Sequence, residues 1–200
     1  MNTKADREEQ LVLELLDAVG KQSNVSQRHL AHHLGVALGL ANSYLKRCIR
    51  KGFIKITEVP ANRYLYYLTP KGFAEKSRLT AKYLASSLEF YRKAGESCLR
   101  LFGQCQGCGW KRILLCGRSD LAEIAALRAQ EMEIEIVGVY DPHAESRRMA
   151  GGMVWRTFKE LPPFDVCILT DLNAPILAFE HLRGLVEQEK ILVPDILNLD

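Results

Sequence analysis

The sequence predicts a two-domain α/β protein, with an N-terminal winged helix-turn-helix and a C-terminal Rossmann-like parallel sheet. Apolar residues first repeat at helical spacing and then alternate in two short strands that form a hairpin. After about residue 110, short apolar strands alternate with helices, as in a parallel sheet. The charge divides as well, because residues 1–92 hold 15 Lys and Arg against 8 Asp and Glu, whereas residues 93–200 hold 12 against 16. A basic half joined to an acidic half indicates that only the first half meets a polyanion.

The first element is a helix over residues 9–19, where apolar residues share one face. A short second helix over residues 27–34 follows Ser26, a residue type that caps helix N-termini. A third helix over residues 38–51 stops at Gly52, a C-terminal glycine signal. These three helices are the core of a helix-turn-helix unit.

Two strands over residues 53–58 and 63–68 form the wing, joined by a turn that contains Pro60. Thr69 and Pro70 then start a further helix, expected to reach about Arg92. Residues 93–110 end in a stretch rich in Gly and Cys and are expected to be a linker. The domains are therefore expected at residues 1–92 and 111–200.

The third helix is expected to pack with one face and to enter the DNA major groove with the other. Ala41, Leu45 and Cys48 have the spacing of a packed stripe. The opposite side offers residues suited to base edges or phosphates, with Arg63 added from the second strand: Gly39, Asn42, Ser43, Lys46, Arg47 and Arg50. For each charged residue, the alternative is a solvated helix face. With the order of the elements, the interpretation that we favour is binding to double-stranded DNA.

Two stretches of this half resemble a known family. Residues 26–55 (SQRHLAHHLGVALGLANSYLKRCIRKGFIK) are similar to the helix-turn-helix of MarR-type regulators, especially the subgroup associated with exopolysaccharide gene clusters. Residues 68–80 (LTPKGFAEKSRLT) resemble the stretch that follows the wing in that subgroup. The resemblance implies a DNA-binding transcription regulator that is commonly dimeric. It departs from the general pattern at Ser43, where the family frequently has arginine.

A homodimer is also expected from the fourth helix, which places aromatic and aliphatic residues together with Thr80 near one side: Phe73, Thr80, Tyr83, Leu84, Leu88 and Tyr91. Two-fold proteins match two-fold DNA sites. The alternative is that this side packs against the wing or the second domain of the same chain.

The second domain has a possible ligand site at the turn after its first strand. Gly117 and Ala122 meet two of the three small-residue requirements of a dinucleotide fold, whereas Ser119 replaces the second glycine and either blocks a pyrophosphate or hydrogen-bonds to one. Asp141 lies 24 positions after Gly117, near where an acidic residue would hold ribose hydroxyls. The carboxyl ends of the strands are expected to place the following residues around one crevice: Gly117, Arg118, Ser119, Asp141, His143, Thr170, Asp171 and Asn173.

The order of a winged helix and a Rossmann-like domain resembles that of Rex-type redox-sensing repressors. The second domain is also similar to the nucleotide-binding domain of sugar acetyltransferases from polysaccharide pathways. These resemblances imply a nucleotide, a nucleotide sugar or NAD(H) as effector, and the incomplete glycine pattern favours the nucleotide sugar or a related metabolite. The alternative is a domain that only mediates assembly on DNA.

Other chemistry has weaker support. Cys105 and Cys108 form a C-x-x-C pair that suits a metal site or a redox pair, but no second pair accompanies it, so plain thiols are expected. No nucleophile elbow, P-loop or paired catalytic acid is present, and a nucleotide-dependent enzyme is the least favoured alternative. The charged start and the lack of a long apolar run predict a cytoplasmic protein without a membrane span.

Overall fold

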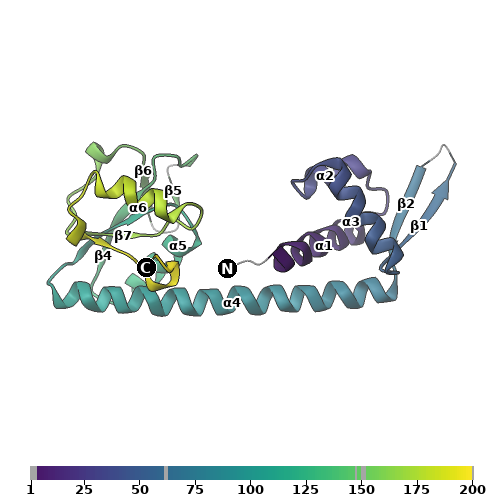
Figure 1. Ribbon diagram of the computed structural model, residues 1–200. Helices are drawn as coiled ribbons and strands as arrows, with labels where there is room; N and C mark the ends of the chain where they lie inside the picture. The colour runs from purple at the N-terminus through teal and green to yellow at the C-terminus, as the bar shows by residue number, and fades with distance from the viewer. Residues whose placement is uncertain (1–3, 61–62, 147, 150–151, 200) are drawn as a thin grey trace. The chain divides into compact units, whose positions relative to one another are not determined.

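The computed structural model describes residues 4–60, 63–146, 148–149 and 152–199, and the chain forms two compact units (Figure 1). The first unit ends at Ser87, and the second begins at Leu88. Both units include part of one helix, α4 (Pro70–Gly107). Among the described residues, no helix combines the length and the apolar character needed to cross a membrane.

Three helices form the body of the first unit, namely α1 (Lys4–Lys21), α2 (Gln27–His33) and α3 (Leu38–Arg50). The expected cap of α2 is confirmed, because the Ser26 hydroxyl accepts a hydrogen bond from the backbone N–H of His29. The expected end of α3 is confirmed too, since Gly52 adopts a φ of +74° directly after the helix.

The wing consists of β1 (Ile54–Val59) and β2 (Arg63–Leu68), an antiparallel pair that extends away from the three helices in Figure 1. Residues 61–62 of its turn lie outside the described residues. The backbone N–H of Tyr66 donates to the carbonyl of Ser23, which attaches the segment before α2 to β2. This order of elements is that of a winged helix-turn-helix, as expected.

The junction between the wing and α4 is held by Thr69. Its hydroxyl accepts a hydrogen bond from the N–H of Gly72 and donates to the carbonyl of Gly52 at 2.6 Å. A Cβ at position 72 would lie 2.0 Å from the carbonyl oxygen of Phe53. A glycine is therefore required where the first turn of α4 crosses the start of the wing.

The second unit is built on a six-stranded sheet in the order β5-β6-β4-β3-β7-β8. Its strands are β3 (Arg112–Cys116), β4 (Glu135–Tyr140), β5 (Arg148–Met149), β6 (Gly152–Trp155), β7 (Val166–Leu169) and β8 (Ile191–Leu192). All neighbouring pairs are parallel except β5 with β6. The expected parallel sheet is confirmed, and the short strands β5 and β6 extend it on the side of β4.

Helices cover both faces of this sheet. The alternating residues of β3 divide between two apolar clusters, because Ile113 and Leu115 pack with residues of α4 and α5 (Asp120–Ala129), whereas Leu114 and Cys116 pack with residues of α6 (Pro175–Arg183). Three 3-10 turns, at Phe158–Glu160, Gln188–Lys190 and Asp195–Leu197, complete the connections.

The segment expected to be a linker, residues 93–110, is instead helical as far as Gly107. Its residues Ala94, Cys98, Leu101, Phe102 and Cys105 recur at helical spacing and are buried in the core of the second unit. Burial of this stripe stabilises a helix that contains glycines, so tertiary packing overrides the local composition.

Candidate nucleic-acid interface

Helix α3 has one buried face and one exposed face. Ala41, Leu45 and Cys48 are buried in the core of the first unit, which confirms the expected packed stripe. Four of the residues expected to contact DNA lie exposed on the other side, namely Gly39, Ser43, Lys46 and Arg50. Among the described residues, no ion pair involves Lys46 or Arg50, so both cations are free to meet phosphates.

Two other expected contact residues have different surroundings. The guanidinium of Arg47 forms an ion pair of 3.1 Å with the carboxylate of Glu8 on α1. Asn42 is half-buried, and its Oδ1 atom is buried without a hydrogen-bond partner among the described residues. Arg63 lies at the start of β2, opposite Val59, but its side chain is outside the described residues. The exposed face of α3 is therefore centred on Ser43, Lys46 and Arg50.

Further cations lie on the segments that adjoin α3, some near its end and Arg28 near its start. The ammonium groups of Lys51 and Lys71 each lie over the ring of Phe53, at 5.7 and 5.6 Å from its centroid. Lys55 is exposed on β1, and Arg28 is exposed on α2. Sequence reasoning gave Arg28 no role, because only the fold brings α2 close to the wing.

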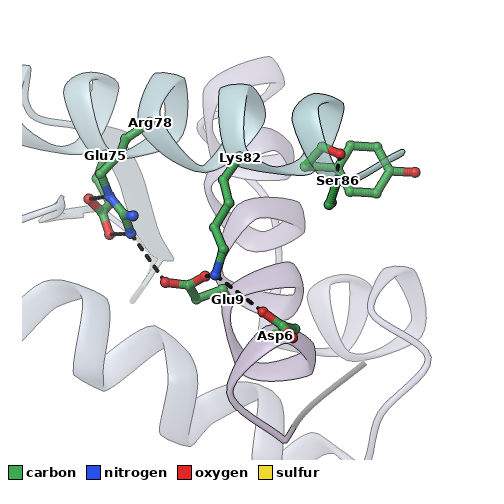
Figure 2. Close-up of polar contacts among 7 residues, drawn as sticks. Asp6, Glu9, Glu75, Arg78, Lys82 and Ser86 are labelled. Carbon is green, nitrogen blue, oxygen red and sulfur yellow. Dashed lines mark hydrogen bonds and ion pairs between the residues drawn. The ribbon is translucent and has the colours of Figure 1, made fainter. Parts of the chain in front are cut away.

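A ladder of ion pairs joins α1 to α4 (Figure 2). The ammonium group of Lys82 contacts the carboxylates of Glu9 and Asp6, and the guanidinium of Arg78 contacts Glu9 at 3.4 Å and Glu75 at 2.9 Å. The hydrogen bond from Lys82 is the main cause that lowers the pKa of Glu9, and the hydrogen bond from Arg78 likewise lowers the pKa of Glu75. Both carboxylates therefore stay charged to a lower pH than an isolated glutamate does.

The ladder continues towards both α3 and the end of α1. Glu8, next to Glu9 in the chain, holds Arg47 of α3. Asp17 binds both Lys21 and Lys76 at 2.7 Å, and these hydrogen bonds lower its pKa. The orientation of α3 relative to α4 thus depends partly on charged contacts, which salt and acid weaken.

In the second unit, the predicted crevice residues do gather at the carboxyl ends of β3, β4 and β7. Gly117 has a φ of +107°, and a Cβ there would lie 2.5 Å from the backbone nitrogen of Asp171. The hydroxyl of Thr170 donates to the carbonyl of Gly117 at 2.7 Å. The turn after β3 is therefore tightly fixed against the turn after β7.

Most polar groups of this crevice bind one another. The Ser119 hydroxyl caps α5 by accepting hydrogen bonds from the N–H groups of Leu121 and Ala122, and it donates to the carbonyl of Thr170. The carboxylate of Asp141 accepts from the backbone N–H groups of Arg118 and His143.

The carboxylate of Asp171 is occupied in the same way, because it accepts hydrogen bonds from the backbone N–H groups of Asn173 and Ala174. The exposed side chains of Arg118, His143 and Asn173 remain available to a ligand.

The cysteines are reduced thiols in the structure. Cys108 is exposed, whereas the other five are buried, and burial raises the pKa of Cys48, Cys98 and Cys105 to about 11. Within the described ranges, no three His, Cys, Asp or Glu side chains gather closely enough to hold a metal ion.

Helix α4 exposes large apolar side chains where the two units meet along the sequence. Tyr83, Leu84 and Leu88 are each about half exposed, at 50%, 54% and 53% of their surface, and Phe73 is exposed near the start of the helix. Tyr91 of the expected dimer stripe instead lies against the guanidinium of Arg128, 5.4 Å from its ring centroid.

Comparisons with known proteins bear on the first unit. Residues 9–55 match a family of winged helix-turn-helix DNA-binding domains. A comparison with curated proteins found no match.

Among solved structures, the chain is similar to a MarR family protein of Mycobacterium tuberculosis in complex with p-aminosalicylic acid, with 20% identity over 40% of this chain and 61% of that one, at a TM-score of 0.36. It is similar to FabT of Streptococcus pneumoniae in complex with DNA, with 26% identity over 39% of this chain and 55% of that one, at a TM-score of 0.33. It is also similar to the transcriptional regulator PcaV of Streptomyces coelicolor, with 19% identity over 50% and 75% of the two chains, at a TM-score of 0.40. The chain thus spans less than two thirds of the first two of these structures.

Proposed function

We propose that the protein is a transcription regulator of MarR type whose first unit binds double-stranded DNA through α3. The observation that carries this proposal is the outer face of that helix, where Ser43, Lys46 and Arg50 are exposed while the opposite face is packed. A helix of this kind fits the major groove, where hydroxyl and guanidinium groups meet base edges and cations meet phosphates. The match of residues 9–55 to DNA-binding domains supports the same function.

Within this face, we assign the closest base contacts to Gly39 and Ser43 and the phosphate contacts to Lys46 and Arg50. Gly39 leaves open space, since a Cβ there would meet nothing within 4 Å. Asn42 and Arg47 reach bases only after rearrangement, because Asn42 is half-buried and Arg47 is held by Glu8. Arg63 is assigned to a phosphate or to the minor groove from its place at the start of β2.

We further propose that two copies associate through α4. Leu84 and Leu88 lie four residues apart on one side of this helix, and both are about half exposed, as is Tyr83. Contact with a second copy would remove this apolar surface from water. The two recognition helices would then read a site with two-fold symmetry.

For the second unit, we propose a metabolite-sensing role with a nucleotide or nucleotide sugar as effector. The strand order β6-β4-β3-β7-β8 corresponds to the 3-2-1-4-5 order of a Rossmann-like sheet, in which ligands bind at the carboxyl ends of the strands. Arg118, His143 and Asn173 are the side chains that would meet the ligand there. The resemblance to regulators of exopolysaccharide genes supports a role in polysaccharide biosynthesis.

The hydrogen bonds inside this crevice favour a second candidate function, in which the unit only mediates assembly. Ser119 already accepts hydrogen bonds from two N–H groups at the start of α5 that a pyrophosphate would need. Thermal unfolding of the full chain with nucleoside diphosphates and nucleotide sugars separates the two functions, because a ligand that binds the folded state raises its melting temperature. A rise that Arg118→Ala abolishes supports sensing, whereas unchanged melting with every compound supports assembly.

Selection of duplex DNA by the full chain tests DNA binding itself. We expect an enriched sequence whose affinity falls steeply with salt. A Ser43→Glu variant should no longer bind the selected duplex, because a carboxylate on the outer face of α3 repels the phosphates. The control Ser86→Glu on α4 should keep the parental affinity. If the full chain enriched no duplex and showed no salt-dependent binding, the proposed function would be wrong.

A further inference from the structure

A groove of about 650 Å³ lies beside the start of α3, between the beginning of α2 and strand β2. Its walls include Ser26, Gln27 and Arg28 from α2 and its cap, Leu38 from α3, and Tyr64 and Tyr66 from β2. None of these residues belongs to the DNA-contacting set assigned above. The hydrogen bond from the N–H of Tyr66 to the carbonyl of Ser23 joins the two walls.

The chemistry of the groove suits a phosphodiester chain. Among the described residues that line it, Arg28 carries the charge, and no carboxylate is present. Tyr64 is 47% exposed and offers its hydroxyl, whereas the buried Tyr66 accepts a hydrogen bond from Gln27 at 3.4 Å. Leu38, 42% exposed, supplies an apolar contact of the kind that a deoxyribose ring accepts.

The position of the groove points to the same occupant. Leu38 is the first residue of α3 and is followed directly by Gly39, so the groove continues the face that we assign to DNA. When a helix lies in the major groove and a wing reaches the neighbouring minor groove, one sugar–phosphate backbone passes between them. The groove is bounded by β2 of the wing and borders the start of α3, so it adjoins both of those elements of this chain.

We propose that this groove binds the DNA backbone at that crossing, a proposal that rests on the proposed function. Arg28 pairs with one phosphate, the Tyr64 hydroxyl donates to a phosphate oxygen, and Leu38 packs on the intervening sugar. These contacts fix the register of the wing and α3 on the duplex and carry no sequence information.

The test compares the full-length protein with Arg28→Gln and Tyr64→Phe on a selected duplex and on an unrelated duplex, over a range of salt concentrations. We expect Arg28→Gln to reduce the slope of log K against log salt by about 0.9 per bound chain. Tyr64→Phe should weaken binding by about 2- to 10-fold, the effect of one lost hydrogen bond. Both losses should be equal on the two duplexes.

The matched controls are Arg92→Gln on α4 and Tyr67→Phe, whose side chain lies on the opposite face of β2 from Tyr64. Both should bind like the parent. Neutral methylphosphonates placed singly along the duplex provide a second readout. A methylphosphonate at one position should weaken DNA binding by the parent protein and leave DNA binding by Arg28→Gln unchanged, because the variant has already lost that phosphate contact.

The outcomes separate this proposal from the proposed function. If the parent binds DNA with strong salt dependence while folded Arg28→Gln keeps its affinity and slope, the groove proposal is overturned and DNA binding stands. A loss confined to the selected duplex also overturns it, since that would indicate a base contact. If the parent binds no duplex, the proposed function fails, and the groove proposal fails with it.

Discussion

Replacing Lys46 and Arg50 by glutamine removes two cations from the exposed face of α3 without touching its packed face. Both side chains are exposed, and neither forms an ion pair among the described residues. Arg47, between them in the chain, is excluded from the substitution because it is paired with Glu8. The double variant should therefore keep the fold of the first unit and lose phosphate contacts.

The size of the effect follows from the number of cations removed. Each phosphate contact contributes about 0.9 to the slope of log K against log salt, so two contacts contribute about 1.8 per chain. Between 50 and 200 mM salt, the parent should consequently lose about 12-fold more affinity per bound chain than Lys46→Gln/Arg50→Gln. A dimer on a two-fold site would double the change in slope to about 3.6.

Fluorescence anisotropy of a labelled duplex, titrated at four or more salt concentrations, measures this slope. The matched control is Lys111→Gln/Lys159→Gln, which removes the same charge from exposed positions of the second unit. The control should keep the parental slope. An equal drop in both double variants would refute the assignment, because net charge alone would then explain the binding, and an unchanged slope in Lys46→Gln/Arg50→Gln would refute it as well.

Three further predictions concern the fold. In urea unfolding, Gly72→Ala should destabilise the protein by about 1–3 kcal/mol, because the new Cβ would meet the carbonyl of Phe53. The control Gly103→Ala lies in the same helix and has open space, so it should be neutral or stabilising by up to about 1 kcal/mol. Equal changes in the free energy of unfolding for the two variants would contradict this account. Hydrogen bonds from Lys21 and Lys76 lower the pKa of Asp17 below its ordinary 3.8. The stabilising contribution of Asp17 is therefore present above pH 3.8 and is lost as the pH falls through the lowered pKa. Between pH 6 and pH 3, the free energy of unfolding in urea should consequently fall less for Asp17→Asn than for the parent. A thiol reagent at neutral pH should rapidly modify one cysteine per native chain, and Cys108→Ser should abolish this fast reaction; fast modification of a second thiol would show that a cysteine buried here is accessible.

The elements with local signals could be predicted from the sequence. Ser26 caps α2, Gly52 ends α3 and Pro70 begins α4. These boundaries were predictable because each depends on residues within one helical turn. The parallel strands β3, β4 and β7 were predictable as well, since they are short apolar runs between helices.

The length of α4 was not predictable from local composition. The Gly- and Cys-rich end of residues 93–110 predicted a linker, but in the structure this segment is helical as far as Gly107, and its Gly95 makes room for Arg128 of α5, whose Nε would lie 2.7 Å from a Cβ there. That contact joins residues 33 positions apart in the chain. A stripe of buried residues then stabilises the helix through the segment that looked like a linker.

In the candidate interface, too, the features set by local spacing were predictable, and those set by contacts distant in sequence were not. Helical spacing correctly separated the packed residues of α3 from the exposed Ser43, Lys46 and Arg50. It did not show that Glu8 holds Arg47, because this pair spans 39 positions and depends on how α1 packs against α3. The position of Arg28 beside the wing was also not predictable, since only the folded unit brings α2 next to β2.

Site-specific photo-crosslinking tests most directly whether the outer face of α3 lies against DNA. A benzophenone amino acid is introduced at position 43 on α3 or, as the control, at position 86 on α4, and each protein is irradiated with a labelled selected duplex. We predict a crosslink from position 43 that unlabelled duplex competes away, and none from position 86. A crosslink from position 86 with none from position 43 would contradict the assignment of α3 as the helix that reads DNA.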